Sequence, residues 1–269
     1  MMTPSPESSP AGRRFADLRT AWLSLRASHG ILVREIACVG ASRTLLCVEL
    51  DPTTVSSITL VAGVHGDEPA APWALFSLVR DRLLDRRFGY RIWPCTNPTG
   101  YEAGTRESGD GVDINRTFSK GGTSPESRAI MTANRDRAYA LSIDLHEDHE
   151  ATGFYGYETL VDRTPRYRDV VTTALDCAGL PLQTIHPGFD LGTPPEAESA
   201  QEVTRGWIAV DAKREAAYFN GLPFTLAMSR RAAPHALTFE SPRTRAWDER
   251  IAYHRVAVTA AIAATLAIP

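Results

Sequence analysis

The segment from Ser57 to Glu68, SITLVAGVHGDE, sets the fold class of this 269-residue chain. It loses its polar residues quickly and becomes a short apolar run, which is typical of a strand that is buried on both faces of a sheet. A His-Gly turn ends the run, and residues 73–84 then have the apolar spacing of an amphipathic helix. A strand, a polar turn and a helix in this order predict one unit of an α/β fold.

Two later apolar runs end in the same way. Residues 141–145 are followed by His146, and residues 236–239 are followed by Glu240. A helical pattern over residues 124–138 precedes the first of these runs and another helical pattern follows it, so strands alternate with helices. We therefore expect a three-layer α/β/α sandwich with a mixed, mostly parallel central sheet.

The chain contains no internal repeat and no interior linker rich in Pro, Gly or Ser. We expect residues 15–269 to form a single domain. Residues 1–14 are rich in Ser and Pro and are expected to be a disordered tail.

Composition excludes several classes of function. The formal net charge is -3, which provides no basic surface for nucleic acid or an anionic membrane. No stretch approaches the roughly 18 apolar residues that a membrane helix needs. The four cysteines form no CxxC pair, and the N-terminus lacks the apolar region of a signal peptide. We expect a cytoplasmic protein with reduced thiols that binds neither nucleic acid nor membrane.

The ends of the three apolar runs suggest a metal site. In open α/β sheets, functional sites form beyond the carboxyl ends of the strands. His65 and Glu68 are three residues apart at a turn and can hold one side of a metal ion, and His146 would be the third ligand. A catalytic zinc ion takes three protein ligands and keeps a fourth position open. His149 is the alternative ligand, and Glu147–Glu150 otherwise read as a solvated acidic loop.

The long polar loop before residue 124 offers groups that suit a substrate. Asn115 and Arg116 place amide donors beside a guanidinium, a pair that suits a carboxylate. Arg106 could face an oxygen that becomes charged during reaction. The carboxylate of Glu240 could take a proton from metal-activated water. Ordinary ion pairs within the loop are the alternative, and Asp113 could tie the loop to a ligand histidine.

Six short motifs stand in a fixed order along the chain: HGDE at 65–68, NPTG at 97–100, Arg106, DINR at 113–116, DLH at 144–146 and TFE at 238–240. Together they resemble the zinc carboxypeptidase family and its relatives, the succinylglutamate desuccinylase/aspartoacylase group. The resemblance implies a single zinc-hydrolase catalytic domain with one Zn²⁺ per chain. It also implies the following roles: zinc ligation by His65, Glu68 and His146, carbonyl polarisation by Arg106, carboxylate binding by Asn115 and Arg116, and general base and acid catalysis by Glu240.

Family carboxypeptidases also carry a mobile tyrosine in the stretch before the catalytic glutamate. Tyr218 lies in that stretch and is the candidate, whereas Tyr155 and Tyr157 could instead line the pocket. The acidic run after His146 could favour a substrate that bears an amine.

The leading hypothesis is a zinc metallocarboxypeptidase that cleaves an amide bond next to a free carboxylate of a small peptide. An N-acyl amino acid deacylase of the succinylglutamate desuccinylase/aspartoacylase type is the alternative. Those deacylases typically add a β-rich C-terminal domain, whereas the segment after Glu240 reads as helical, so the peptidase is favoured. A non-catalytic binding module on the same fold would need a broken ligand set, and here the set is intact.

Overall fold

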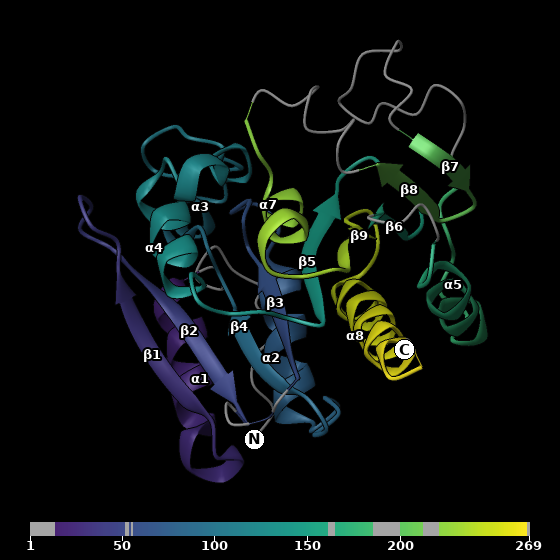
Figure 1. Cartoon of the computed structure of the whole chain (residues 1–269), viewed down its shortest axis with the longest axis horizontal. Helices are drawn as coiled ribbons and strands as arrows, with labels where there is room; N and C mark the ends of the chain where they lie inside the picture. The colour runs from purple at the N-terminus through teal and green to yellow at the C-terminus, as the bar shows by residue number, and fades with distance from the viewer. Residues whose placement is uncertain are drawn as a thin grey trace.

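The computed structural model describes residues 14–51, 54, 56–160, 165–184, 200–211 and 221–267. Residues 1–13 of the expected tail therefore lie outside the described residues. Strands within the described ranges form one nine-stranded sheet in the order β1-β2-β4-β3-β5-β9-β6-β8-β7 (Figure 1). Their bounds are β1 Leu32–Ala37, β2 Thr44–Leu50, β3 Ser57–Ala62, β4 Gly89–Trp93, β5 Leu141–Asp148, β6 Tyr155–Leu160, β7 Ala200–Thr204, β8 Trp207–Asp211 and β9 Ala236–Pro242.

Parallel pairing is concentrated in the middle of the sheet. Strands β4, β3, β5 and β9 are all parallel to one another, and β6 also pairs with β8 in parallel. The remaining pairs, including β1 with β2 and β9 with β6, are antiparallel. The expected mixed α/β sheet is confirmed. Because the central strands are parallel, the carboxyl ends of β3 and β5 open on the same edge of the sheet.

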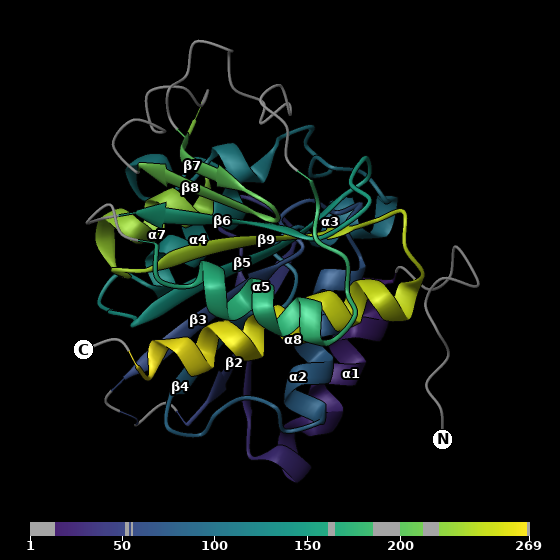
Figure 2. The ribbon, with the colours of Figure 1, turned by 90° about the vertical axis from the view of Figure 1, so that its right-hand side faces the viewer.

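Helices cover both faces of the sheet. Helix α8 packs between α2 and α5, and α1 packs beside α2 on the same face (Figure 2). Helix α7 contacts β5 and β9 from the other face, where α4 also lies. The helix bounds are α1 Phe15–His29, α2 Ala70–Arg80, α3 Pro98–Ala103, α4 Pro125–Ala133, α5 Arg168–Cys177, α7 Phe224–Arg231 and α8 Trp247–Thr265.

The two larger of three hydrophobic cores among the described residues lie on opposite faces of the sheet. Side chains alternate across a strand, and Leu60 of β3 accordingly joins the core under α2 and α8, whereas Val61 joins the core under α4 and α7. In β2, Val48 likewise joins the core under α2 and α8, and Cys47 joins the core under α4 and α7. Such alternation explains why the central strands read as continuous apolar runs in the sequence.

Several local expectations differ from the structure. Helix α4 begins after Ser124, which forms a capping box with Ser127, and it ends at Ala133 rather than near residue 138. The side chain of Asn134 ends it by donating to Ile130 O at 3.0 Å and accepting from Tyr139 Oη at 2.6 Å.

Strands β6 and β7 and helix α7 were not expected from the sequence. The long polar loop also contains helix α3, which Asn97 caps by accepting from Gly100 N at 2.9 Å. The helix expected over residues 212–219 lies outside the described residues. None of the described helices is long and apolar enough to cross a membrane.

Candidate metal centre and substrate pocket

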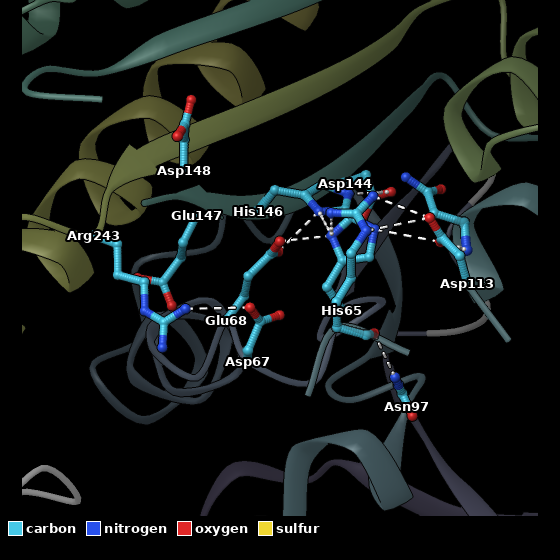
Figure 3. Close-up of polar contacts among 12 residues, drawn as sticks. His65, Asp67, Glu68, Asn97, Asp113, Asp144, His146, Glu147, Asp148 and Arg243 are labelled. Carbon is cyan, nitrogen blue, oxygen red and sulfur yellow. Dashed lines mark hydrogen bonds and ion pairs between the residues drawn. The ribbon is translucent and has the colours of Figure 1, made fainter. Parts of the chain in front are cut away.

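The histidines at the ends of two central strands converge. His65 follows β3, Glu68 lies in the turn before α2, and His146 lies in β5. His65 Nδ1 is 2.6 Å from Glu68 Oε1, His146 Nδ1 is 2.9 Å from Glu68 Oε2, and the two Nδ1 atoms are 3.2 Å apart (Figure 3). All three side chains are buried, and together they form a cluster that could hold a metal ion.

Each imidazole faces a second carboxylate with its other ring nitrogen. His65 Nε2 lies 3.5 Å from Asp113 Oδ1, and His146 Nε2 lies 3.0 Å from Asp144 Oδ2. If each Nε2 carries a proton, each Nδ1 has a lone pair that is directed at the carboxylate of Glu68. The nitrogen and oxygen lone pairs then repel one another unless a cation lies between them. Carboxylates in this position are the usual outer partners of metal-binding histidines.

The spacing of the two imidazole nitrogens fits such an ion. Tetrahedral zinc ligands at about 2.0–2.1 Å from the metal stand roughly 3.3 Å from one another. The 3.2 Å between the Nδ1 atoms of His65 and His146 is close to this value. The donor set of two imidazoles and one carboxylate, buried together, therefore fits a divalent cation of the zinc type.

A tight turn brings His65 and Glu68 to this place. A Cβ on Gly66 would stand 2.0 Å from the carbonyl carbon of Gly100, so the turn can pack here only because residue 66 has no side chain. Gly66 N and Asn97 Nδ2 both donate to Arg106 O, at 3.4 and 3.1 Å. The HGDE turn, the NPTG segment and the backbone of Arg106 thus form one packed unit.

Glu240 lies beside the metal cluster. It stands opposite His146 in the register of β5 and β9, and it lines the same pocket. Burial raises the pKa of Glu240 well above its ordinary value and outweighs the opposing effect of His146. The negative charges of Glu68, Asp148 and Asp144 raise the pKa further.

The arginines expected to bind substrate lie at the same pocket. The Nε and Nη2 atoms of Arg106 donate to Asp113 Oδ2 at 3.3 and 3.1 Å, and its Nη1 lies 3.3 Å from His65 Nδ1. Asn115 Oδ1 accepts from Phe224 N at 3.1 Å, which directs the amide NH₂ group away from that partner. Arg116 also lines the pocket, with Nη1 donating to Asn115 O at 3.2 Å.

The pocket has a volume of about 270 Å³ and extends from the metal cluster along the sheet. Tyr155 stands opposite Glu240. Tyr157 stands opposite Thr238, which is two residues further from the carboxyl end of β9. Thr225 of α7 closes this region, with its Oγ1 atom 2.7 Å from that of Thr238. The described residues that line this inner region are neutral: Tyr157, Thr159, Val210, Thr225, Leu226 and Thr238.

The acidic run after His146 is a solvated loop only at His149 and Glu150, which are exposed. Glu147 is buried and accepts from Arg250 Nε at 2.6 Å and from Ala70 N at 2.7 Å. Asp148 accepts from Tyr155 Oη at 2.7 Å. The solvated-loop interpretation is wrong for Glu147, because a partner more than a hundred residues away along the chain satisfies its charge.

The sequence suggested two further candidates, His149 and Tyr218. His149, the alternative ligand, is exposed, and its Nε2 lies 3.7 Å from Glu150. Tyr218 lies outside the described residues. Sequence reasoning missed His254 of α8, a buried residue; burial and the neighbouring His146 lower its pKa to about 3, so it is neutral. His254 lies in a helical run of the sequence, and nothing in that pattern indicated that it would lie close to His146.

Comparison with known proteins identifies the family. The catalytic-domain profile of succinylglutamate desuccinylase/aspartoacylase matches residues 54–188, half of the chain. The chain belongs to this family. The desuccinylase/aspartoacylase-family chain is also 29% identical over 106 residues to carboxypeptidase SOL1 from Arabidopsis thaliana. That match covers 32% of the chain and 22% of SOL1, so the chain spans about a fifth of this curated relative.

Solved structures place this family member among carboxypeptidase-like folds. A candidate metallopeptidase from Shewanella denitrificans OS217 has a TM-score of 0.74 and 22% identity, covering 98% of each chain. A metallo-carboxypeptidase from Burkholderia cenocepacia has a TM-score of 0.65 and 16% identity, covering 94% of this chain and 69% of the other. At these identities the likeness shows the fold. The family resemblance expected from the six motifs is confirmed.

Proposed function

We propose that this desuccinylase/aspartoacylase-family protein is a zinc-dependent hydrolase of the metallocarboxypeptidase type. It cleaves an amide or peptide bond next to a free carboxylate in a small peptide or N-acyl amino acid. The observation that carries the proposal is the convergence of His65, Glu68 and His146 beside Glu240 in one pocket. The family match and the carboxypeptidase-like fold support it.

His65, Glu68 and His146 would hold one zinc ion per chain, with Asp113 and Asp144 fixing the two imidazole rings. When bound, zinc supplies a Lewis acid and lowers the pKa of water to about 7. The three protein ligands leave a fourth position for the reacting groups.

Glu240 moves the proton in this proposal. It takes a proton from the attacking water and delivers it to the leaving amine. A carboxyl group whose pKa is raised by burial suits this task, because it must hold the proton between the two transfers. Arg106, whose guanidinium lies beside His65, would stabilise the carbonyl oxygen as it becomes charged.

Substrate recognition would come from Arg116 and Asn115, which place a guanidinium and an amide at the pocket for the free carboxylate. Anchoring a terminal carboxylate makes an enzyme trim an end instead of cutting inside a chain. The neutral inner region would accept an uncharged side chain. The mobile-tyrosine role of Tyr218 and the cytoplasmic location stay predictions.

The family match favours a second function, hydrolysis of an N-acyl amino acid. Such a substrate also has an amide bond next to a carboxylate, so the same residues would act in the same roles. The two functions differ in what lies on the acyl side of the bond: a peptide or a small acyl group.

The test is an activity screen of the zinc-loaded protein on short peptides, murein-type peptides and N-acyl amino acids. Glu240→Gln should lower kcat by about 10²- to 10⁴-fold on the best substrate, whereas the exposed Glu150→Gln should leave it unchanged. Full activity of Glu240→Gln would refute the mechanism. Turnover of N-acyl aspartate or succinylglutamate alone would replace the peptidase by the deacylase.

A further inference from the structure

A buried ion pair lies directly behind the metal cluster. Glu147, the residue after His146, has a side chain that is 0% exposed, and that of Arg250 is 5% exposed. Glu147 Oε1 accepts from Arg250 Nε at 2.6 Å, and Oε2 accepts from Ala70 N at 2.7 Å. Glu147 thereby connects strand β5, the first residue of α2 and helix α8.

These connections include every segment that carries a proposed ligand. Ala70 is two residues after Glu68, and the peptide of Glu147 continues from His146. A carboxylate at the N-terminus of α2 also has a favourable interaction with the helix dipole. Moving β5 relative to the HGDE turn would break the Ala70 hydrogen bond, so this bond, together with the β3–β5 pairing, constrains the distance between His146 and Glu68.

A second link from the same turn is weaker. Arg243 Nη1 donates to Asp67 Oδ2 at 3.2 Å, but both side chains are 29% exposed (Figure 3). Partly exposed ion pairs contribute little to rigidity because water competes for both partners. The buried Glu147 carboxylate has no such competition.

We propose that Glu147 and Arg250 are positioning residues that hold the turn carrying His65 and Glu68 in register with His146, and so set the affinity for the metal. The inference rests on the proposed function, because it assumes that these ligands bind zinc. Neither residue needs to touch the metal or the substrate. The Glu147 carboxylate orders the backbone of α2, and Arg250 holds that carboxylate in place.

The experiment compares the zinc dissociation constant, from competition with a chromophoric chelator, with the Tm of the metal-free protein. Glu147→Gln should weaken zinc binding by about tenfold or more, within the range known for residues that orient metal ligands. Glu49→Gln is the control, because Glu49 forms a largely buried pair with Arg91, 6% and 11% exposed, between β2 and β4 and away from the ligands. It should lower Tm and leave zinc affinity within twofold of wild type.

A single variant could lose stability by leaving one charge buried alone, so a double variant separates folding from positioning. In Glu147→Leu/Arg250→Met the pair is replaced by apolar side chains, a change that often preserves stability. The double variant should regain a Tm near wild type and still bind zinc at least about tenfold more weakly, because leucine has no oxygen to accept from Ala70 N.

Wild-type zinc affinity in the double variant would overturn the positioning role, as would an equal loss of affinity in Glu49→Gln. If the wild-type protein itself binds no zinc, the proposed function fails and this inference fails with it. Wild-type zinc binding with unaltered affinity in the variants refutes the positioning role alone, so the two failures are distinguishable.

Discussion

His146 Nε2 lies 3.0 Å from Asp144 Oδ2, on the same face of strand β5. Residues two apart on a strand share a face, so the strand geometry itself places the carboxylate behind the proposed ligand. His65 has the same kind of partner in Asp113, but that carboxylate comes from a distant loop. The two partners therefore differ in how firmly the backbone holds them.

Asp144→Asn should weaken zinc binding about 10- to 100-fold, since loss of an outer carboxylate lowers the basicity and fixed orientation of the ligand. Asp113→Asn should also weaken zinc binding. It should release the Arg106 side chain as well, because Arg106 donates to the Asp113 carboxylate. Chelator competition measures the affinity, and Asp248→Asn at the start of α8 serves as control. Unchanged affinity in both variants would show that the imidazoles do not use these carboxylates.

Arg116→Gln should lower kcat/KM about 10- to 100-fold on substrates with a free carboxylate, because charge-assisted hydrogen bonds to that group are lost. The amidated form of the same substrate should be hydrolysed slowly and equally by both proteins. The exposed Arg86→Gln is the control. An equal loss on both substrate forms would assign Arg116 a role in folding.

The sequence predicted that His65 and His146 would converge, because each lies at or just beyond the carboxyl end of a central strand. Apolar runs show where strands end, and parallel strands place those ends together. His65, His146 and Glu240 were found in this way. The roles of the loop residues were inferred from their side-chain chemistry and from the family resemblance, since no periodicity constrains residues 99–122.

Tertiary pairing explains the elements that pattern reasoning missed. Strand β6 contains Gly156 and a buried Glu158, which accepts from Trp207 Nε1 at 3.1 Å and from Arg166 N at 2.7 Å. A charged residue in a short run argues against a buried strand unless these distant partners are known. The burial of Glu147 could not be predicted for the same reason, because its partner Arg250 is distant in the sequence.

Gly66→Ala should destabilise the protein by ~3 kcal/mol or more, because the new Cβ meets the backbone of Gly100, which cannot rotate away. Gly179→Ala is the comparison. Its φ of +70° is unfavourable for alanine, yet nothing lies within 4 Å of the added Cβ, so roughly 1–2 kcal/mol is expected. Urea unfolding measures both. Similar losses in the two variants would show that the HGDE turn can relax.

Asp81 at the end of α2 should make stability depend on pH. Its hydrogen bonds with Arg80 and then Arg255 of α8 lower its pKa to about 2. A folded pKa below the unfolded value near 3.8 means that this stabilisation is present above about pH 4 and is lost as the pH falls towards 2.

Asp81→Asn should therefore be less stable than wild type at pH 7, by roughly 0.5–1 kcal/mol for a partly exposed pair. The difference should shrink between pH 4 and 2 in urea unfolding. Arg255→Gln should reduce the same pH dependence by removing one partner. If the free energies of unfolding of wild type and Asp81→Asn change in parallel over this pH range, the α2–α8 ion pair contributes nothing to stability.

Thr225→Asp should change which substrates are preferred. Thr225 and Thr238 form the neutral inner region of the pocket, and a carboxylate there would attract a basic side chain and repel an acidic one. The ratio of kcat/KM for a basic over a neutral side chain next to the cleaved bond should rise about tenfold or more. Thr225→Ser keeps the hydroxyl and should keep the wild-type ratio. An unchanged ratio in Thr225→Asp, with wild-type zinc affinity, would mean that the substrate side chain does not enter this region.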